Sequence, residues 1–105
     1  MLRAQRFSEA RERFARLSKL KSTRGPALVA LAEIAFQEKN YEETIRSAKM
    51  AADRGGGVRA KVLLGDAHFR LSHYQDAVSA YTQALRIDPQ NSSAKSGLAL
   101  ASKRM

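Results

Sequence analysis

Residues 58–91 read VRAKVLLGDAHFRLSHYQDAVSAYTQALRIDPQN. The apolar residues of this stretch recur every three or four positions, which predicts helices over residues 58–71 and 74–87. Ser72 and His73 lie between the two periodic runs and indicate a tight turn. Asp88-Pro89 ends the second run, because proline cannot continue a helix interior. Since so short a connection makes neighbouring helices antiparallel, the stretch is expected to be a helical hairpin.

The same pattern occurs elsewhere in the chain. A shift of 33 positions relates Leu31-Ala32, Phe36, Tyr41, Ile45 and Ala51 to Leu64-Gly65, Phe69, Tyr74, Val78 and Ala84. A shift of 34 positions relates Phe7, Glu9 and Leu17 to Tyr41, Glu43 and Ala51, and Leu64-Gly65 to Leu98-Ala99. So many matches favour an internal repeat over the alternative, an unrelated helical bundle with fortuitous periodicity.

Four further helices follow from the same periodicity, over residues 3–20, 26–38, 41–54 and about 92–103. Ser22 or Thr23 could cap the second of these, with Pro26 in its first turn, and Asn91 or Ser92 could cap the last. The triplet Gly55-Gly56-Gly57 breaks the chain between hairpins. No segment alternates as a strand would, so we expect an all-α fold of about six helices.

The 34-residue unit resembles the tetratricopeptide repeat (TPR), a helix–turn–helix unit, through Leu64-Gly65, Tyr74, Ala77, Tyr81, Ala84 and Pro89. The resemblance implies a right-handed superhelical stack of antiparallel hairpins, that is, a TPR-like α-solenoid. It divides a single domain, 1–105, into a partial repeat with a basic helix (1–24), two repeats (25–57 and 58–91) and a C-terminal capping helix (92–105). The chain begins inside a repeat, as a segment cut from a longer protein would, although Met1 could equally be a natural start.

The unit at 25–57 matches the family less well than the unit at 58–91. Ala48 stands where the family has a large aromatic residue, and Thr44 replaces the usual alanine. The glycine triplet replaces the usual Asp-Pro ending. These departures predict a looser first hairpin.

Charge is concentrated at the two ends of the chain. The net charge of +9 divides into +6 for residues 1–24, −1 for 25–57, +1 for 58–91 and +3 for 92–105. The absence of cysteine excludes disulfides and thiolate metal sites. No apolar run is long enough to span a membrane, and the Arg-rich N-terminus lacks a signal-peptide stretch. A mitochondrial presequence is the alternative to the cytoplasmic location that we expect.

Nothing in the chain indicates catalysis, and we expect no enzyme activity, cofactor or metal. His68 occupies a helix position that the family fills with a large buried side chain, so we interpret it as a core histidine. His73 follows five residues later, which is not the spacing of metal ligands on one helix. The glycine triplet follows a helix and lacks the spacing of a phosphate-binding loop, so we interpret it as a turn between repeats.

The resemblance implies a concave groove, lined by the first helix of each repeat, that binds an extended peptide or amphipathic helix of a partner protein. The chain would then be an interaction module, part of a larger scaffold or adaptor. Transferring the family's groove positions gives Val29, Glu33, Phe36, Gln37, Arg59, Val62, Leu63, Asp66, Phe69 and Arg70, continued by Ser96, Leu100, Lys103 and Arg104 in the last helix. Phe36 and Phe69 could instead only pack between repeats. The acids Glu33 and Asp66 argue against binding of a terminal carboxylate.

Two other functions stay open. Arg6, Arg13, Arg16 and Lys19 form a basic face on the first helix that could contact nucleic acid or an acidic surface, although a solvated face is the commoner outcome. A small secretion-type chaperone for one subunit is the other alternative. Because Phe7 and Phe14 belong to a helix without most of its hairpin partner, we also expect self-association through an end of the array, or cover from a neighbouring domain. We expect no membrane partner.

Overall fold

The computed structural model describes residues 2–17 and 24–105, and the side chains of 8–16 and 25–105. The described residues form six α-helices and no strand, so the prediction of an all-α fold is confirmed. The helices are α1 (Leu2–Leu17), α2 (Arg24–Gln37), α3 (Tyr41–Asp53), α4 (Gly57–Arg70), α5 (Tyr74–Ile87) and α6 (Ser92–Arg104). Residues 18–20 of the first predicted helix and the predicted caps Ser22 and Thr23 lie outside the described residues.

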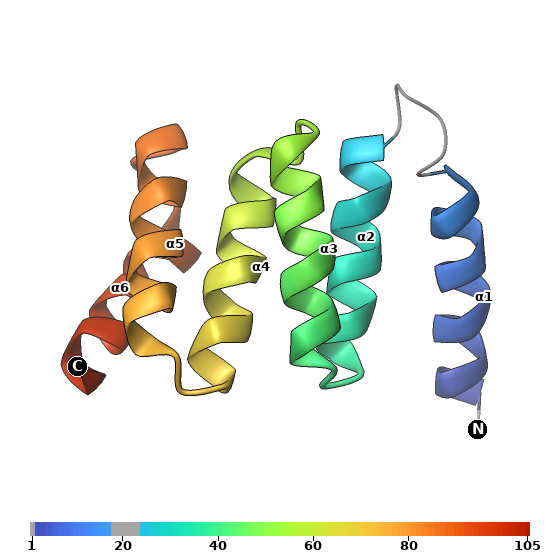
Figure 1. Cartoon of the computed structure of the whole chain (residues 1–105), viewed down its shortest axis with the longest axis horizontal. Helices are drawn as coiled ribbons and strands as arrows, with labels where there is room; N and C mark the ends of the chain where they lie inside the picture. Colours follow the sequence, from blue (N-terminus) through green and yellow to red (C-terminus); the bar gives the residue numbers. More distant parts are fainter. Residues whose placement is uncertain (1, 18–23) are drawn as a thin grey trace.

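The helices lie side by side in chain order, as a row of antiparallel hairpins (Figure 1). Each helix contacts the next one along the chain. In addition α2 contacts α4, and α4 contacts α6, so the first helices of successive hairpins form one continuous layer. No helix among the described residues has the length and hydropathy needed to cross a membrane.

Two turns of the same kind close the hairpins. Lys39 and Ser72 adopt positive φ angles of 63° and 64°, which reverse the chain after α2 and α4. Asn40 then begins α3, where its side-chain oxygen accepts a hydrogen bond from the Glu43 amide at 3.3 Å. Asn91 begins α6 in the same way, with an Ala94 N–H···Oδ1 distance of 2.9 Å. Of the two predicted caps of this last helix, the structure therefore has Asn91.

The glycine triplet forms the turn between the two hairpins, as expected. Gly55 and Gly57 have φ angles of 84° and 67°, which favour glycine because other residues rarely adopt them. A Cβ on Gly56 would lie 2.7 Å from the carbonyl oxygen of Ala51. Steric constraints in the turn therefore favour glycine at each position of the triplet.

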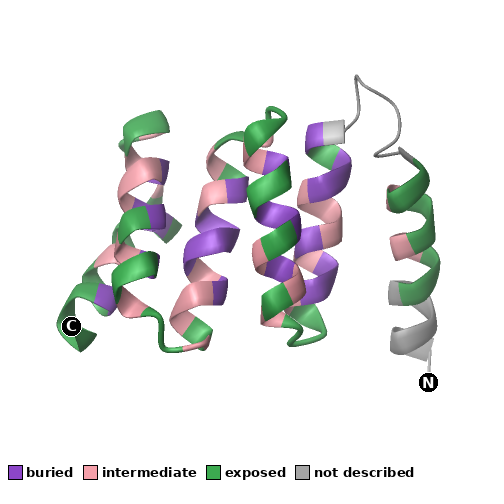
Figure 2. Ribbon diagram, viewed as in Figure 1, coloured by how far each residue is buried: buried purple, intermediate pink, exposed green. Residues whose placement is uncertain are grey.

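The core is built largely from alanine along the faces where helices meet (Figure 2). Exposure is 3% or less for Ala27, Ala32, Ala35, Ala48, Ala51, Ala60, Ala67, Ala77, Ala80, Ala84, Ala94 and Ala101. Small side chains allow helix backbones to approach closely. Thr44, where the family has alanine, is also fully buried, and its hydroxyl donates a hydrogen bond to the Asn40 carbonyl at 2.9 Å. The replacement of alanine by threonine therefore leaves no buried polar group without a hydrogen-bond partner at this position.

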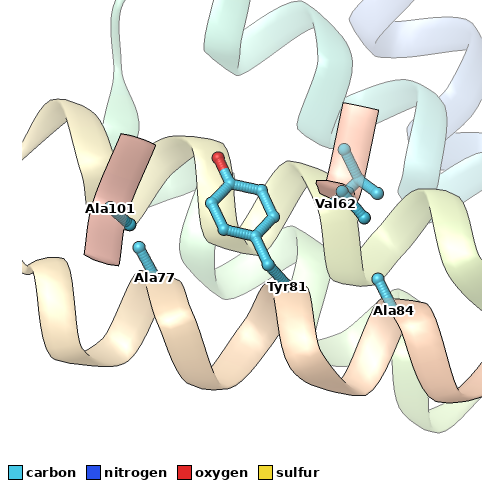
Figure 3. Packing of buried hydrophobic residues seen from close by; sticks show 6 residues of the cluster. Val62, Ala77, Tyr81, Ala84 and Ala101 are labelled. Carbon is cyan, nitrogen blue, oxygen red and sulfur yellow. The ribbon is translucent and has the colours of Figure 1, made fainter. Parts of the chain in front are cut away.

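Tyr81 is the largest fully buried side chain among the described residues. It extends from α5 between Ala77 and Ala84, one turn away on either side (Figure 3). A Cβ on Gly65 of α4 would lie 2.7 Å from its ring, and a Cβ on Gly97 of α6 would lie 2.3 Å from it. The ring therefore occupies space that two glycines leave in the flanking helices.

This packing predicts an unusual response to Gly97→Ala. On an open helix this change stabilises by about 1 kcal/mol, because alanine is the better helix former. Here the new methyl group would overlap the Tyr81 ring, and overpacking of a core costs about 1–3 kcal/mol. We expect Gly97→Ala to destabilise the wild-type chain and to stabilise the Tyr81→Ala variant, measured by urea unfolding. Stabilisation in both backgrounds would contradict the packing.

Candidate functional site

Two adjoining hollows cross the layer formed by α2, α4 and α6. The first, of about 470 Å³, lies between α1, α2 and α4. The second, also about 470 Å³, lies among α2, α4, α5 and α6. Both are lined by Phe36 and Asp66, so together they form one groove. The groove is lined by Ala10, Phe14, Ala30, Glu33, Ile34, Phe36, Gln37, Arg59, Leu63 and Asp66, and further along by Phe69, Arg70, Tyr81, Ser93, Ser96, Gly97 and Leu100.

Two half-buried phenylalanines lie in the groove, and each is held by a tyrosine of the next helix. Phe36 meets Tyr41 edge-on, with ring centroids 5.5 Å apart. Phe69 meets Tyr74 in the same manner at 5.4 Å. Such aromatic pairs prefer an edge-to-face arrangement, so the two rings are fixed in position before any ligand arrives. The pair recurs in both hairpins, and Phe36 lies where the two hollows join.

Each charged side chain of the groove has a partner within the protein. The Arg59 guanidinium of α4 donates to the Glu33 carboxylate of α2 at 2.8 Å. The Arg70 guanidinium lies over the Phe36 ring, 5.6 Å from its centroid, within cation–π range. The Tyr81 hydroxyl donates a hydrogen bond to the Asp66 carboxylate. Two acids and two cations therefore balance, and the groove carries no strong field of either sign.

Asp66 connects the core to the groove. Burial raises the pKa of the Tyr81 phenol, and the hydrogen bond to the Asp66 carboxyl and its charge raise it further. Burial also raises the pKa of Asp66 above its ordinary value of 3.8, because desolvation disfavours the carboxylate. The hydrogen bond from Tyr81 and the nearby Arg59 and Arg70 act in the opposite direction and limit the increase.

Most of the residues assigned to the groove from sequence line it in the structure. They are Glu33, Phe36, Gln37, Arg59, Leu63, Asp66, Phe69, Arg70, Ser96 and Leu100. On α4, Arg59, Leu63, Asp66 and Arg70 follow the spacing of one helix face, because residues three and four apart are neighbours on a helix. Leu63 contributes little surface, since it is only 2% exposed.

Val62 was wrongly assigned to the groove. It is 1% exposed and packs in the core against Ala77 and Tyr81. The reason is that α4 contacts α3 and α5 as well as α2 and α6, which leaves only a narrow free face. Val29, likewise assigned to the groove, packs against core clusters and is not a lining residue. Lys103 and Arg104 are exposed at the end of α6 and are also not among the lining residues.

The sequence analysis missed the contribution of α1 to the groove. Ala10 and Phe14 close one side of the first hollow, and Arg11 forms an ion pair with Glu38 in the turn after α2. Phe14 was expected at an end of the array, on a helix without most of its hairpin partner, and the sequence does not indicate that it faces the groove. Tyr81, Ser93 and Gly97 were missed for a different reason, since core and cap residues reach the groove only once α5 and α6 are packed.

On the predicted basic face, Arg13 and Arg16 are exposed. They line a shallow hollow of α1 together with Glu9, so acid and base are interspersed there. The side chain of Arg6 and the whole of Lys19 lie outside the described residues.

His68 is half-buried, so its interpretation as a buried core residue was wrong. Its Nδ1 lies 3.3 Å from Nδ1 of His73. The helix-spacing argument did not apply to this pair, because α4 ends at Arg70 and the turn at Ser72 brings His73 back. Burial lowers the pKa of His68, and His73 and Lys49 lower it further, while Asp76 opposes them.

Two models of the tetratricopeptide repeat family match the chain, one over residues 2–58 and one over residues 58–91. None of the curated proteins matches it. Among solved structures, the chain is similar to one described as "Arabidopsis OM64 TPR domain", with a TM-score of 0.86 and 19% sequence identity. The similarity covers 99% of this chain and 87% of that one, and at this identity it shows the fold alone.

The burial of Asp66 predicts a pH dependence of stability. Since its pKa is raised in the folded state, the folded chain binds this proton more tightly than the unfolded chain. The carboxyl therefore contributes most to stability below its ordinary pKa of 3.8, and the contribution falls as pH rises through the folded pKa. We expect the free energy of unfolding of the wild type minus that of Asp66→Asn to fall as pH rises from below 3.8 through the folded pKa, in urea titrations. A constant or rising difference would contradict the raised pKa of Asp66 as the cause.

Proposed function

The chain belongs to the tetratricopeptide repeat family, and from this premise we propose that its groove holds a peptide or helix of a partner protein. Repeats of this family generally mediate protein–protein interaction. The single observation that carries the proposal is the continuous groove, about 470 Å³ in each half, with the half-buried Phe36 where the halves join. A larger scaffold or adaptor that contains this domain is part of the same proposal.

The groove favours a ligand with apolar side chains. Phe36 and Phe69 are fixed by their tyrosine partners, so binding there does not require ordering of flexible side chains. Glu33 and Arg59 already form an ion pair within the groove, and Asp66 already accepts a hydrogen bond from Tyr81. A strongly charged ligand would have to break these pairs, whereas an apolar segment would leave them intact.

A terminal carboxylate is a poor ligand for this groove. The Arg59 guanidinium is paired with Glu33, and the Arg70 guanidinium lies over the Phe36 ring. Neither is therefore available to bind a carboxylate of the ligand. Glu33 and Asp66 would add repulsion if ionised. An internal segment of a partner chain therefore fits the groove better than its C-terminus.

Electrostatic contact through Arg13 and Arg16 is the competing function, with a small secretion-type chaperone as a further alternative. The interspersed Glu9 weakens the basic face as a phosphate-binding surface. Self-association through the ends of the array stays a prediction. Leu100 on α6 and Met105 after it, at 54% and 68% exposure, leave apolar surface at this end, while Phe14 at the other end is half-buried.

A peptide-binding experiment separates these functions. Short peptides are selected from a random displayed library against the full chain, and one binder is labelled for fluorescence polarisation. Leu100→Glu places a charge in the groove, and Ile87→Glu is its matched control, because Ile87 is 55% exposed and lies outside the groove. We expect Leu100→Glu to weaken binding at least about tenfold, or about 1.4 kcal/mol, and Ile87→Glu to leave it unchanged.

Two further variants test the competing surface. Phe36→Ala should weaken the peptide as Leu100→Glu does, with circular dichroism to check that the fold persists. Reversal of Arg13 and Arg16 to Glu should change affinity little, since rim charges act mainly on association rate. The proposal fails if those reversals are the damaging set and binding is lost steeply with added salt.

A further inference from the structure

A cluster of three potential metal ligands lies at the turn between α4 and α5, outside the groove. His68 belongs to the last turn of α4, His73 is the cap residue of α5, and Asp76 lies in the first turn of α5. One ligand atom from each lies within 4.8 Å of those of the other two. His68 is half-buried, while His73 and Asp76 are exposed, so a cation can reach the cluster from solvent.

The backbone of the turn holds the two imidazoles together. Ser72 has a φ of 64°, and the His73 amide donates to the His68 carbonyl at 2.8 Å. Although His73 is the cap residue of α5, its side chain makes no cap hydrogen bond, so the ring is turned toward His68 instead. The ring centroids are 5.6 Å apart with 45° between the planes, and the Nδ1 atoms are 3.3 Å apart.

The separation of the two nitrogens matches one coordination geometry. A tetrahedral zinc ion with Zn–N bonds of about 2.0–2.1 Å places two nitrogen ligands about 3.3–3.4 Å apart. A square-planar copper or nickel ion would require about 2.8–2.9 Å. The observed 3.3 Å also suits a hydrogen bond between two neutral rings, in which one Nδ1 carries a proton. On binding of a metal ion that proton would move to Nε2 of the same ring, which leaves both Nδ1 atoms free to ligate the ion.

Asp76 completes the set as an anionic ligand. It lies three residues after His73, so both side chains lie on one side of the first turn of α5. Because it is exposed, its carboxylate can rotate toward the imidazoles without displacing packed neighbours. Lys49 of α3 lines the adjoining hollow and opposes a cation, and the negative charge of Asp76 offsets it.

We propose that His68, His73 and Asp76 bind a divalent cation of the zinc class, with water as the fourth ligand. The ion would join the end of α4 to the start of α5 and so stabilise the hairpin at 58–91, because a ligand that binds only the folded chain shifts the folding equilibrium toward it. This site shares no residue with the groove. A failure of the metal site would therefore leave the proposed function unaffected, and the reverse also holds.

The test uses the full chain without an affinity tag, since a histidine tag would bind the same ions. Zn²⁺ binding is measured by competition with a chromophoric chelator, and Co²⁺ reports the geometry through its visible absorption. The sequence contains two histidines and no cysteine, so no other imidazole or thiolate can supply the ligands. We expect one equivalent of Zn²⁺, a tetrahedral Co²⁺ spectrum and a raised melting temperature with Zn²⁺.

The variants define the ligands. His73→Asn should weaken Zn²⁺ binding at least about tenfold and remove the rise in melting temperature, without loss of fold because His73 is exposed. His68→Asn should do the same, and Asp76→Asn should weaken binding less. Asp53→Asn, an exposed acid on α3, is the matched control and should bind as the wild type does. Absence of stoichiometric binding, or wild-type binding by His73→Asn, would overturn the proposal.

Discussion

The ring of Tyr81 fixes how the last three helices pack. It lies between Gly65 of α4 and Gly97 of α6, where a methyl group on either glycine would overlap it. Its hydroxyl then reaches Asp66, a lining residue of the groove. The packing of the core and the position of a groove side chain are therefore set by one residue, and a shift of α5 along its neighbours would break both.

The preceding hairpin solves the same packing problem with different residues. Ala48 occupies the position of Tyr81, 33 residues earlier, and is fully buried. Around it Ala32 takes the place of Gly65, and Leu63, 34 residues before Gly97, takes the place of that glycine. Ala32, Ala48 and Leu63 all belong to one core cluster. Tyr81 with two glycines in one hairpin thus corresponds to Ala48 with one alanine and one leucine in the other. The summed side-chain volume at the three positions stays similar, which is the kind of exchange that a core tolerates best.

Local sequence determined the helices and their turns. Hydrophobic periodicity located all six helices, and Asn40, Asn91 and the glycine triplet mark boundaries by well-understood backbone chemistry. The groove was harder, because it depends on which helix faces remain free after packing. Val62 lies three residues from Arg59 on α4, yet contacts from α5 bury it. Contacts that cross a turn or join separate helices, such as His68 with His73, do not follow from spacing on a single helix.

The ion pair of Arg59 with Glu33 and the contact of Arg70 with the Phe36 ring occupy charged groups of the groove. Apolar contact is therefore expected to be the main source of ligand affinity. Methyl NMR of the full chain with a selected peptide tests this most directly, because it locates the ligand without mutation. We expect the largest shift change at Leu100, with Met50 and Ile87, exposed outside the groove, unchanged. Changes confined to Met50 and Ile87, or to Ala15 between the exposed Arg13 and Arg16, would contradict the assignment of the groove as the binding surface.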